Sequence, residues 1–169
     1  KKCWASLYTP RALFYRVARG SKRKKVSVAV VVQKMIQSEI SGVCFSVHPV
    51  TRDKNQMVIE AVWGLGEALV SGQVTPDTYI VEKLKIPAFA KALEGKQNSN
   101  FKILDVNVSE QKKMITGKKK ETEEISVLQS KQLKQKLSGK QIRELANLCL
   151  KIEKHYKSPQ DIEWALENG

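Results

Sequence analysis

Helical periodicity is clearest near the end of the chain, where apolar side chains recur every three or four residues between positions 140 and 156. Lysines and glutamates fill the positions between them, so the pattern predicts a helix with one buried face. Ser138 stands where an N-cap residue is expected. A second helical pattern covers residues 1–19, and Pro10 begins a new helical piece within it.

Strand patterns account for most of the remaining apolar positions. Residues 26–35 form a valine-rich run that reaches Gln33, as in a strand buried on both faces. Residues 101–108 and 112–116 alternate and predict a hairpin, which a surface connector at 117–124 follows. The other predicted strands are residues 43–47, 57–63, 78–83 and 161–166. Short strands separated by turns favour a mainly antiparallel sheet with flanking helices, which is an α+β fold.

The last predicted strand separates two kinds of side chain. Because side chains alternate along a strand, Asp161 and Glu163 point to one face, and Ile162 and Trp164 point to the other. Two carboxylates on one face repel each other unless that face is open to water or a positive group lies against it. This segment alone leaves both explanations open.

Composition and charge narrow the class of protein. A chain of 169 residues with 41% hydrophobic residues can bury a core, and no apolar stretch is long enough to span a bilayer. The formal net charge of +13 would suit nucleic-acid binding. Aromatic residues do not interleave with the lysine runs, however, and this disfavours a nucleic-acid partner. Three cysteines without a CxxC spacing argue against a disulfide framework or a zinc site and indicate a reducing cytoplasm.

Two segments offer groups that suit a flat or sugar-bearing ligand. The strand that reaches Gln33 offers backbone groups and one amide to a heteroaromatic ring, unless this glutamine simply marks where a core strand meets solvent. The glycine-rich segment 64–72 would allow close approach of the backbone to a ligand, and Glu67 within it could accept hydrogen bonds from a sugar hydroxyl. The segment matches neither a Walker loop nor a GxGxxG fingerprint, and a turn before a helix explains it equally well.

Asp161 and Glu163 are the candidates for a metal site. Carboxylate oxygen is the ligand that Mg²⁺ prefers, whereas solvated acids on an edge strand are the alternative. The two histidines are not expected to take part. His48 lies in a loop without a second metal ligand at fixed spacing, and His155 stands at a helix end, where a cation suits the helix dipole.

Four sequence motifs occur in a fixed order and allow a more specific interpretation of these candidate residues. They are CWASLYTPRA, VSVAVVVQKMI with the following SEISGVCFSVHPVT, WGLGEALVSGQVTPDTYIVEK, and PQDIEW. Together they closely resemble the nucleotide-binding domain of phosphoenolpyruvate synthases and pyruvate phosphate dikinases, a domain that rifampicin phosphotransferases share. The resemblance implies an ATP-grasp fold, in which ATP lies between two α+β lobes, with Mg²⁺ as a second cofactor.

The resemblance also implies roles for particular residues. Asp161 and Glu163 match the metal-binding acids, and Glu67 lies near the ribose by analogy. The segment CFSVHP departs from the commoner FTADP at the loop that contains His48. The implied ATP-binding residues are Gln33, Lys34, Met35, Glu67 and Glu163.

The implied domain organisation makes this chain one part of a larger site. Residues 1–20 correspond to a connecting helix from the first lobe, and residues 21–169 correspond to the second lobe. The first lobe, with its phosphate-binding cations, is expected before Lys1. A QSRP strand, a phosphohistidine domain and a pyruvate domain are expected after Gly169. No catalytic residue is therefore expected within the chain.

The implied function is the ATP-binding part of a phosphoenolpyruvate synthase. That enzyme converts ATP, pyruvate and water into phosphoenolpyruvate, AMP and phosphate through a phosphohistidine on another domain. The partners that this function implies for the chain are ATP and the missing first lobe. Pyruvate is a partner only through the missing domains. A rifampicin phosphotransferase, a pyruvate phosphate dikinase and a non-catalytic remnant that acts as an interaction module remain as alternatives.

Overall fold

The computed structural model describes residues 1–20, 26–84, 100–118 and 121–168. The chain divides into two compact units, residues 1–35 and residues 36–169. Within the described part of the chain, no helix combines the length and the apolar character that crossing a bilayer requires.

The first unit contains short helices. Thr9 caps the last of them, because its side-chain oxygen accepts a hydrogen bond of 3.4 Å from the backbone N–H of Ala12. Pro10 occupies the first helical turn, which confirms the predicted new helical piece. None of the residues in these helices is buried. The elements are α1 (Lys2–Ala5), η1 (Ser6–Tyr8) and α2 (Pro10–Ala18).

Residues 26–35 follow in the same unit, and the prediction that they form a strand buried on both faces is wrong. The segment has no regular secondary structure. Val31 and Val32 are 83% and 95% exposed. β-branched residues favour an extended backbone, but a strand needs a neighbour whose N–H and C=O groups pair with its own. The described residues of this unit supply no such neighbour.

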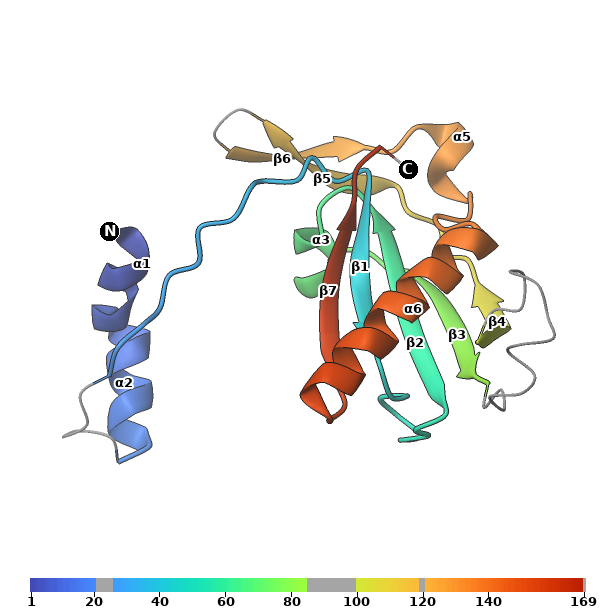
Figure 1. Cartoon of the computed structure of the whole chain (residues 1–169). Coiled ribbons are helices and arrows are strands. Elements are labelled where there is room, and N and C mark those ends of the chain that lie inside the picture. The colour runs from blue at the N-terminus through green and yellow to red at the C-terminus, as the bar shows by residue number, and fades with distance from the viewer. Residues whose placement is uncertain (21–25, 85–99, 119–120, 169) are drawn as a thin grey trace. The chain divides into compact units, whose positions relative to one another are not determined.

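The second unit is built on a five-stranded sheet in the order β4-β3-β2-β1-β7 (Figure 1). All neighbouring strands in it are antiparallel, which confirms the predicted α+β class with a mainly antiparallel sheet. The strands are β1 (Ile40–Phe45), β2 (Gln56–Trp63), β3 (Asp77–Lys83), β4 (Phe101–Asn107) and β7 (Asp161–Leu166).

The predicted hairpin of residues 101–116 is wrong, as is the predicted connector at 117–124. β4 pairs with β3, whereas β5 (Lys113–Lys118) pairs with β6 (Glu121–Ser126) in a separate two-stranded sheet. Alternation along a strand shows which side chains share a face, but it does not show which strand supplies the hydrogen-bond partners. The described residues of this unit also include two four-residue helices, α3 (Glu67–Val70) and α5 (Gln129–Gln132).

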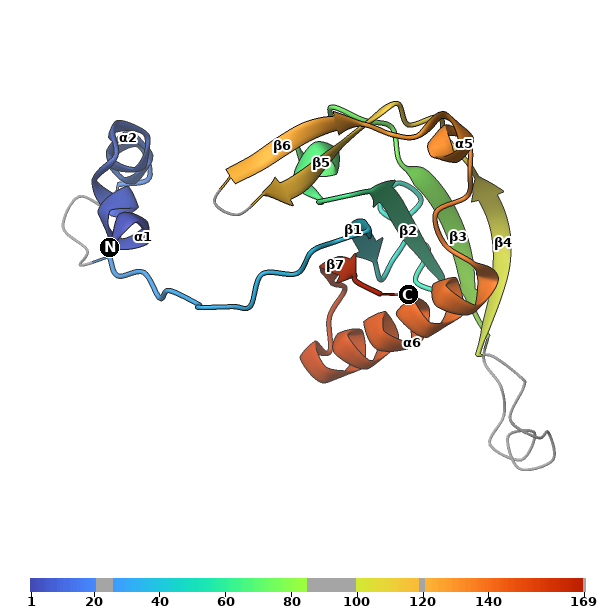
Figure 2. The same ribbon diagram turned by 90° about the horizontal axis from the view of Figure 1, so that it is seen from above.

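Helix α6 (Gly139–Tyr156) covers one face of the large sheet (Figure 2). Ser138 and Gln141 form a capping box, with hydrogen bonds of 2.9 Å and 3.3 Å between each backbone N–H and the other side chain. The N-cap prediction is therefore confirmed. The core lies between α6 and the sheet, and it includes Cys44, Met57, Ile59, Ala61, Tyr79, Val81, Ile142, Ala146 and Cys149.

One ion pair is completely buried beside this core. The Lys136 ammonium lies 2.6 Å from a carboxylate oxygen of Asp77, and neither side chain is exposed. Asp77 also accepts hydrogen bonds from the Tyr79 hydroxyl (2.9 Å) and from the backbone N–H groups of Ser109 (3.0 Å) and Lys136 (2.9 Å). This network ties the start of β3 to the segments on either side of the β5–β6 hairpin.

Candidate functional site

Strand β7 places the two predicted metal-binding acids on an open surface. Asp161 and Glu163 are exposed, whereas Ile162 and Trp164 are partly buried against the core. The predicted division of side chains between the two faces is therefore confirmed. Because α6 covers the core face, both carboxylates lie on the opposite face of the sheet.

Within the part of the chain that the structure describes, neither carboxylate stabilises the fold through a hydrogen bond or an ion pair. In the described residues, no side chain or backbone group donates a hydrogen bond to the carboxylate of Asp161 or Glu163, and no cation pairs with it. Side chains two residues apart on a strand start about 6.6 Å from each other. That spacing and the carboxylate chemistry fit two ligands of a hard cation such as Mg²⁺, with further oxygens coming from elsewhere. The described residues contain no cluster of three or more metal-binding side chains.

The start of β7 is held at a fixed register. The backbone N–H of Ser46 donates to the carbonyl of Gln160 (2.9 Å), and the N–H of Gln160 donates to the Ser46 hydroxyl (2.8 Å). Ser46 is completely buried, so this reciprocal pair is shielded from water. Since one residue of slippage would turn Asp161 and Glu163 toward the core, the pair protects the orientation of both acids.

Sequence reasoning missed a third carboxylate on the same face. Glu60 lies in the middle of β2, between Ile59 and Ala61, which both face the core. It is opposite Val43 of β1, and Val43 is opposite Glu163 of β7. Burial raises the pKa of the Glu60 carboxyl. The sequence signal for Glu60 was a single charged residue inside an otherwise apolar strand. The sequence did not show which strands pair with β2, so it could not place Glu60 near Glu163.

The glycine-rich turn follows directly from the end of β2. Gly64 has a φ of +83°, which favours glycine, and a Cβ there would collide with the Ile115 carbonyl. The Gly64 carbonyl accepts a hydrogen bond of 2.7 Å from the buried Ser41 hydroxyl, and the N–H of Leu65 donates to the Ile115 carbonyl (2.8 Å). The turn is thereby fixed against both β1 and β5.

Glu67 begins α3 immediately after this turn, and its side chain is exposed. Figures 1 and 2 show α3 and α6 on opposite faces of the sheet, so α3 shares the face of the β7 carboxylates. The glycine-rich segment is thus a turn that precedes a helix, as one of the two interpretations of the sequence predicted. It does not conflict with a role in ligand contact, because the helix starts on the candidate face.

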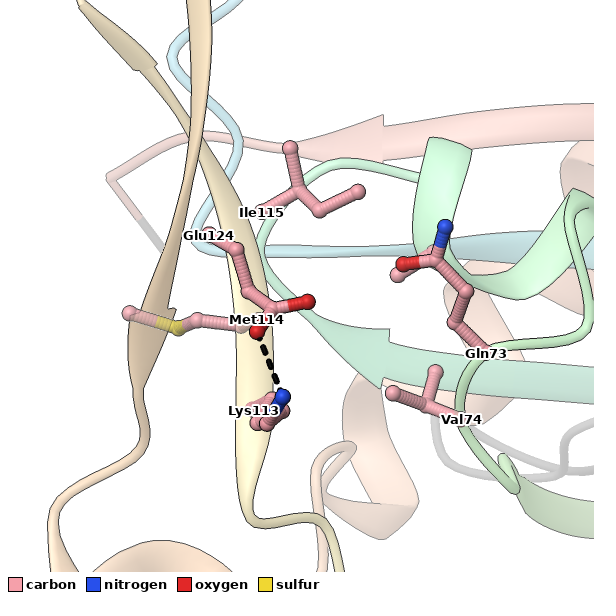
Figure 3. Close-up of a pocket in the computed structure, with 7 residues that line it drawn as sticks. Gln73, Val74, Lys113, Met114, Ile115 and Glu124 are labelled. Carbon is pink, nitrogen blue, oxygen red and sulfur yellow. Dashed lines mark ion pairs between the residues drawn. The ribbon is translucent and has the colours of Figure 1, made fainter.

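A small pocket lies beside α3, but it does not suit a nucleotide. Figure 3 shows it between the segment after α3 and the β5–β6 hairpin, where Lys113 and Glu124 form an ion pair of 2.7 Å. Its volume of about 20 Å³ is room for one water molecule. None of the predicted ATP-binding residues lines it.

Gln33, Lys34 and Met35 are exposed residues of the first unit, in the segment without regular secondary structure. The acids on β7 and Glu67 belong to the second unit. The structure therefore brings Asp161, Glu163 and Glu67 to one face of one sheet, whereas the contact of Gln33, Lys34 and Met35 with a nucleotide stays a prediction.

His48 has a local structural role. Its Nδ1 accepts hydrogen bonds of 3.3 Å from the backbone N–H groups of Val50 and Thr51. An aspartate carboxylate commonly caps a turn in this way, so the imidazole can replace the aspartate of the FTADP motif without loss of the turn. His155 lies exposed near the end of α6, where its ring meets that of Tyr156 edge to face.

Comparison with known proteins agrees with the motifs. Residues 1–169 match the family model described as pyruvate phosphate dikinase, AMP/ATP-binding domain. The chain is 47% identical to a probable phosphoenolpyruvate synthase of Archaeoglobus fulgidus, over 100% of this chain and 20% of that protein. It is 45% identical to a probable phosphoenolpyruvate synthase of Methanocaldococcus jannaschii, over 100% of this chain and 13% of that protein. It is 42% identical to the phosphoenolpyruvate synthase of Pyrococcus furiosus, over 99% of this chain and 20% of that protein.

The chain thus spans one fifth or less of the length of these three relatives, while the family model matches all of it. The resemblance inferred from the four motifs is confirmed. The chain belongs to the pyruvate phosphate dikinase AMP/ATP-binding domain family.

Proposed function

We propose that the chain is the ATP-binding part of a phosphoenolpyruvate synthase and forms the second lobe of an ATP-grasp site. Support comes from the AMP/ATP-binding family and from relatives named as phosphoenolpyruvate synthases. The complete protein would convert ATP, pyruvate and water into phosphoenolpyruvate, AMP and phosphate by way of a phosphohistidine on another domain.

The observation that carries the proposal is the pair of unpaired carboxylates on β7. Asp161 and Glu163 have no hydrogen-bond or ion-pair partner among the described residues, and both carboxylates lie on the same exposed face of one strand, where a bound cation can reach them. In the proposed site they hold Mg²⁺, which when bound neutralises charge on the triphosphate. Gln33, Lys34 and Met35 contact the adenine side, and Glu67 is a further nucleotide contact.

The chain by itself is not proposed to be active. Phosphoryl transfer depends on positioning and on cations that stabilise the transferred group. The proposed acids supply only the metal side of that arrangement. The lysine and arginine that contact the phosphates would come from the first lobe, so the isolated chain should bind ATP weakly.

The test uses the complete natural polypeptide that contains this chain. With ATP and pyruvate, the wild-type protein should form AMP, phosphate and phosphoenolpyruvate in equal amounts. Glu163→Gln keeps the size of the side chain but removes the charge, and it should lower AMP formation by at least about 100-fold while the fold is kept. Glu144→Gln, an exposed acid on α6, is the matched control and should leave the rate unchanged.

Product analysis also separates the alternatives. Release of pyrophosphate in a phosphate-dependent reaction would identify a pyruvate phosphate dikinase instead. Phosphorylation of rifampicin but not of pyruvate would identify a rifampicin phosphotransferase. Absence of all three reactions in the complete polypeptide would favour the non-catalytic interaction module, and an unaltered rate in the Glu163 variant would refute the metal role.

A further inference from the structure

Glu60 and Glu163 lie in one row that crosses the sheet. The pairs Glu163–Val43 and Val43–Glu60 are directly opposite one another in adjacent antiparallel strands. Opposed Cα atoms in such pairs are alternately about 4.5 Å and 5.5 Å apart, so Glu60 starts about 10 Å from Glu163. Residues opposite each other share a face, and both carboxylates therefore belong to the face that carries the proposed nucleotide site.

The neighbours of Glu60 on the same face of β2 are covered, whereas Glu60 itself reaches solvent. Val58 and Val62, its neighbours on the same face of β2, are 5% and 0% exposed. Glu60 between them is partly exposed. Across the row it is opposite Val43 and Thr78. Val43 and Thr78 are partly exposed as well, so the row through Glu60 is open to solvent, whereas the valines on either side of Glu60 along β2 are covered.

No contact among the described residues explains why a carboxylate stands at position 60. No hydrogen bond or ion pair from the described residues engages its side chain, although burial raises the pKa of Glu60 and disfavours its charge. An ionised group that is partly desolvated and unpaired destabilises the folded state. Its position is explained if a donor from a bound molecule completes its hydrogen bonds.

The chemistry of Glu60 restricts which part of a nucleotide it can meet. An ionised carboxylate only accepts hydrogen bonds, and it repels phosphate oxygens. If Mg²⁺ and the triphosphate lie at β7, the group about 10 Å further across the sheet must be neutral and must donate. The ribose directly follows the phosphates in ATP, and its 2′ and 3′ hydroxyls are two adjacent donors that match the two oxygens of one carboxylate.

We propose that Glu60 accepts the hydrogen bonds of the ribose 2′ and 3′ hydroxyls and so makes the site selective for ribonucleotides. The inference rests on the proposed function, which places the nucleotide on this face. It moves the ribose contact from Glu67, which begins a helix beyond the end of β2, to a residue in the same row as Glu163.

The experiment compares nucleotides that differ only in these hydroxyls. AMP and 2′,3′-dideoxy-AMP are not cleaved by phosphoryl transfer, and their affinities for the complete natural polypeptide can be measured by equilibrium dialysis. The wild-type protein should bind AMP at least about tenfold more tightly, because hydrogen bonds to a charged group are lost in the dideoxy compound. Glu60→Gln should weaken AMP binding about tenfold and leave dideoxy-AMP binding within about twofold.

Two further variants make the result specific. Glu82→Gln removes another partly exposed acid from the same sheet face. Glu82 lies near the end of β3, whereas Glu60 is opposite Thr78 at the start of β3, so this variant should leave both affinities unchanged. Glu67→Gln tests the competing assignment and should leave the preference for AMP over its dideoxy form intact. Circular dichroism and urea unfolding confirm that each variant is folded.

Several results would overturn the inference. These are a wild-type protein without preference for the ribose hydroxyls, a Glu60→Gln variant that keeps the preference, and a Glu67→Gln variant that loses it. A dependence of AMP binding on Mg²⁺ that changes in Glu60→Gln would also do so, because it would make Glu60 a metal ligand. Failure of the proposed function is a separate observation, namely AMP and ATP that do not bind or pyruvate that is not phosphorylated.

Discussion

Replacement of Lys136 by methionine tests whether the buried ion pair is essential to the second unit. Lys136 and Asp77 are both completely buried, and the ammonium also donates to the Ser109 carbonyl at 2.9 Å. Methionine fills a similar volume without the charge. The change therefore leaves the Asp77 carboxylate in the interior with hydrogen bonds from Tyr79 and two backbone N–H groups but without a counter-charge.

The expected loss of folding free energy is a large fraction of the total stability of a domain. Removal of one partner from a buried ion pair typically costs about 3–5 kcal/mol, because the remaining charge stays desolvated. A domain is typically stable by about 5–15 kcal/mol, so Lys136→Met should remove a major share of the free energy of unfolding. The double variant with Asp77→Asn carries no buried charge, and it should be more stable than the Lys136→Met variant alone.

Urea unfolding of the 169-residue chain, followed by far-ultraviolet circular dichroism, measures these differences. Lys140→Met is the matched control, because Lys140 is exposed and its nearest acid, Glu144, is 3.8 Å away. Its effect should stay within about 0.5 kcal/mol. A loss below about 1 kcal/mol for Lys136→Met, or a double variant less stable than the single one, would show that the pair is not a desolvated ion pair.

Three shorter predictions concern the glycine turn, the thiols and Glu60. Gly64→Ala should lower the free energy of unfolding by more than Gly72→Ala, because both have positive φ but only the Gly64 Cβ would meet a carbonyl, that of Ile115; Gly72→Ala should cost about 1–2 kcal/mol in the same urea assay. Only Cys3 should react rapidly with a thiol reagent in the folded chain, because the other two cysteines are buried, and equal reaction of all three would contradict the packing. Burial raises the pKa of Glu60, because the charged carboxylate is less well solvated in the folded state than in the unfolded chain. The stability it contributes is complete below its ordinary pKa and is lost as the pH rises through its raised pKa, so the stability of Glu60→Gln relative to wild type should increase as the pH rises above the ordinary pKa of a glutamate.

Elements whose signals come from neighbouring residues could be predicted from the amino-acid sequence. The N-cap at Ser138 and the three- and four-residue periodicity after it predicted α6 from neighbouring residues alone. The bounds of β7 and the faces of its side chains followed from simple alternation. The family followed from ordered motifs, which act as a recognisable pattern before any contact between them is known.

Which strand pairs with which could not be predicted from the sequence and became known from the fold. β4 pairs with β3 and β5 with β6, although the alternation of their residues fits a β4–β5 hairpin equally well. Residues 26–35 have the composition of a buried strand, yet the described residues of their own unit include no strand with which they could pair. Hydrogen-bonded pairing depends on which distant segment lies alongside, and propensity contains no information about that segment.

Long-range placement also decided which charged residues belong together. Asp77 and Lys136 are 59 positions apart in the chain, and neither has a local pattern that predicts a buried ion pair. Glu60 and Glu163 belong to strands separated by β1, so only the register places them in one row. A charge in an apolar run is visible in the sequence, but its electrostatic partner is fixed by the packing of segments that are remote in the chain, because Coulomb interaction depends on distance in space.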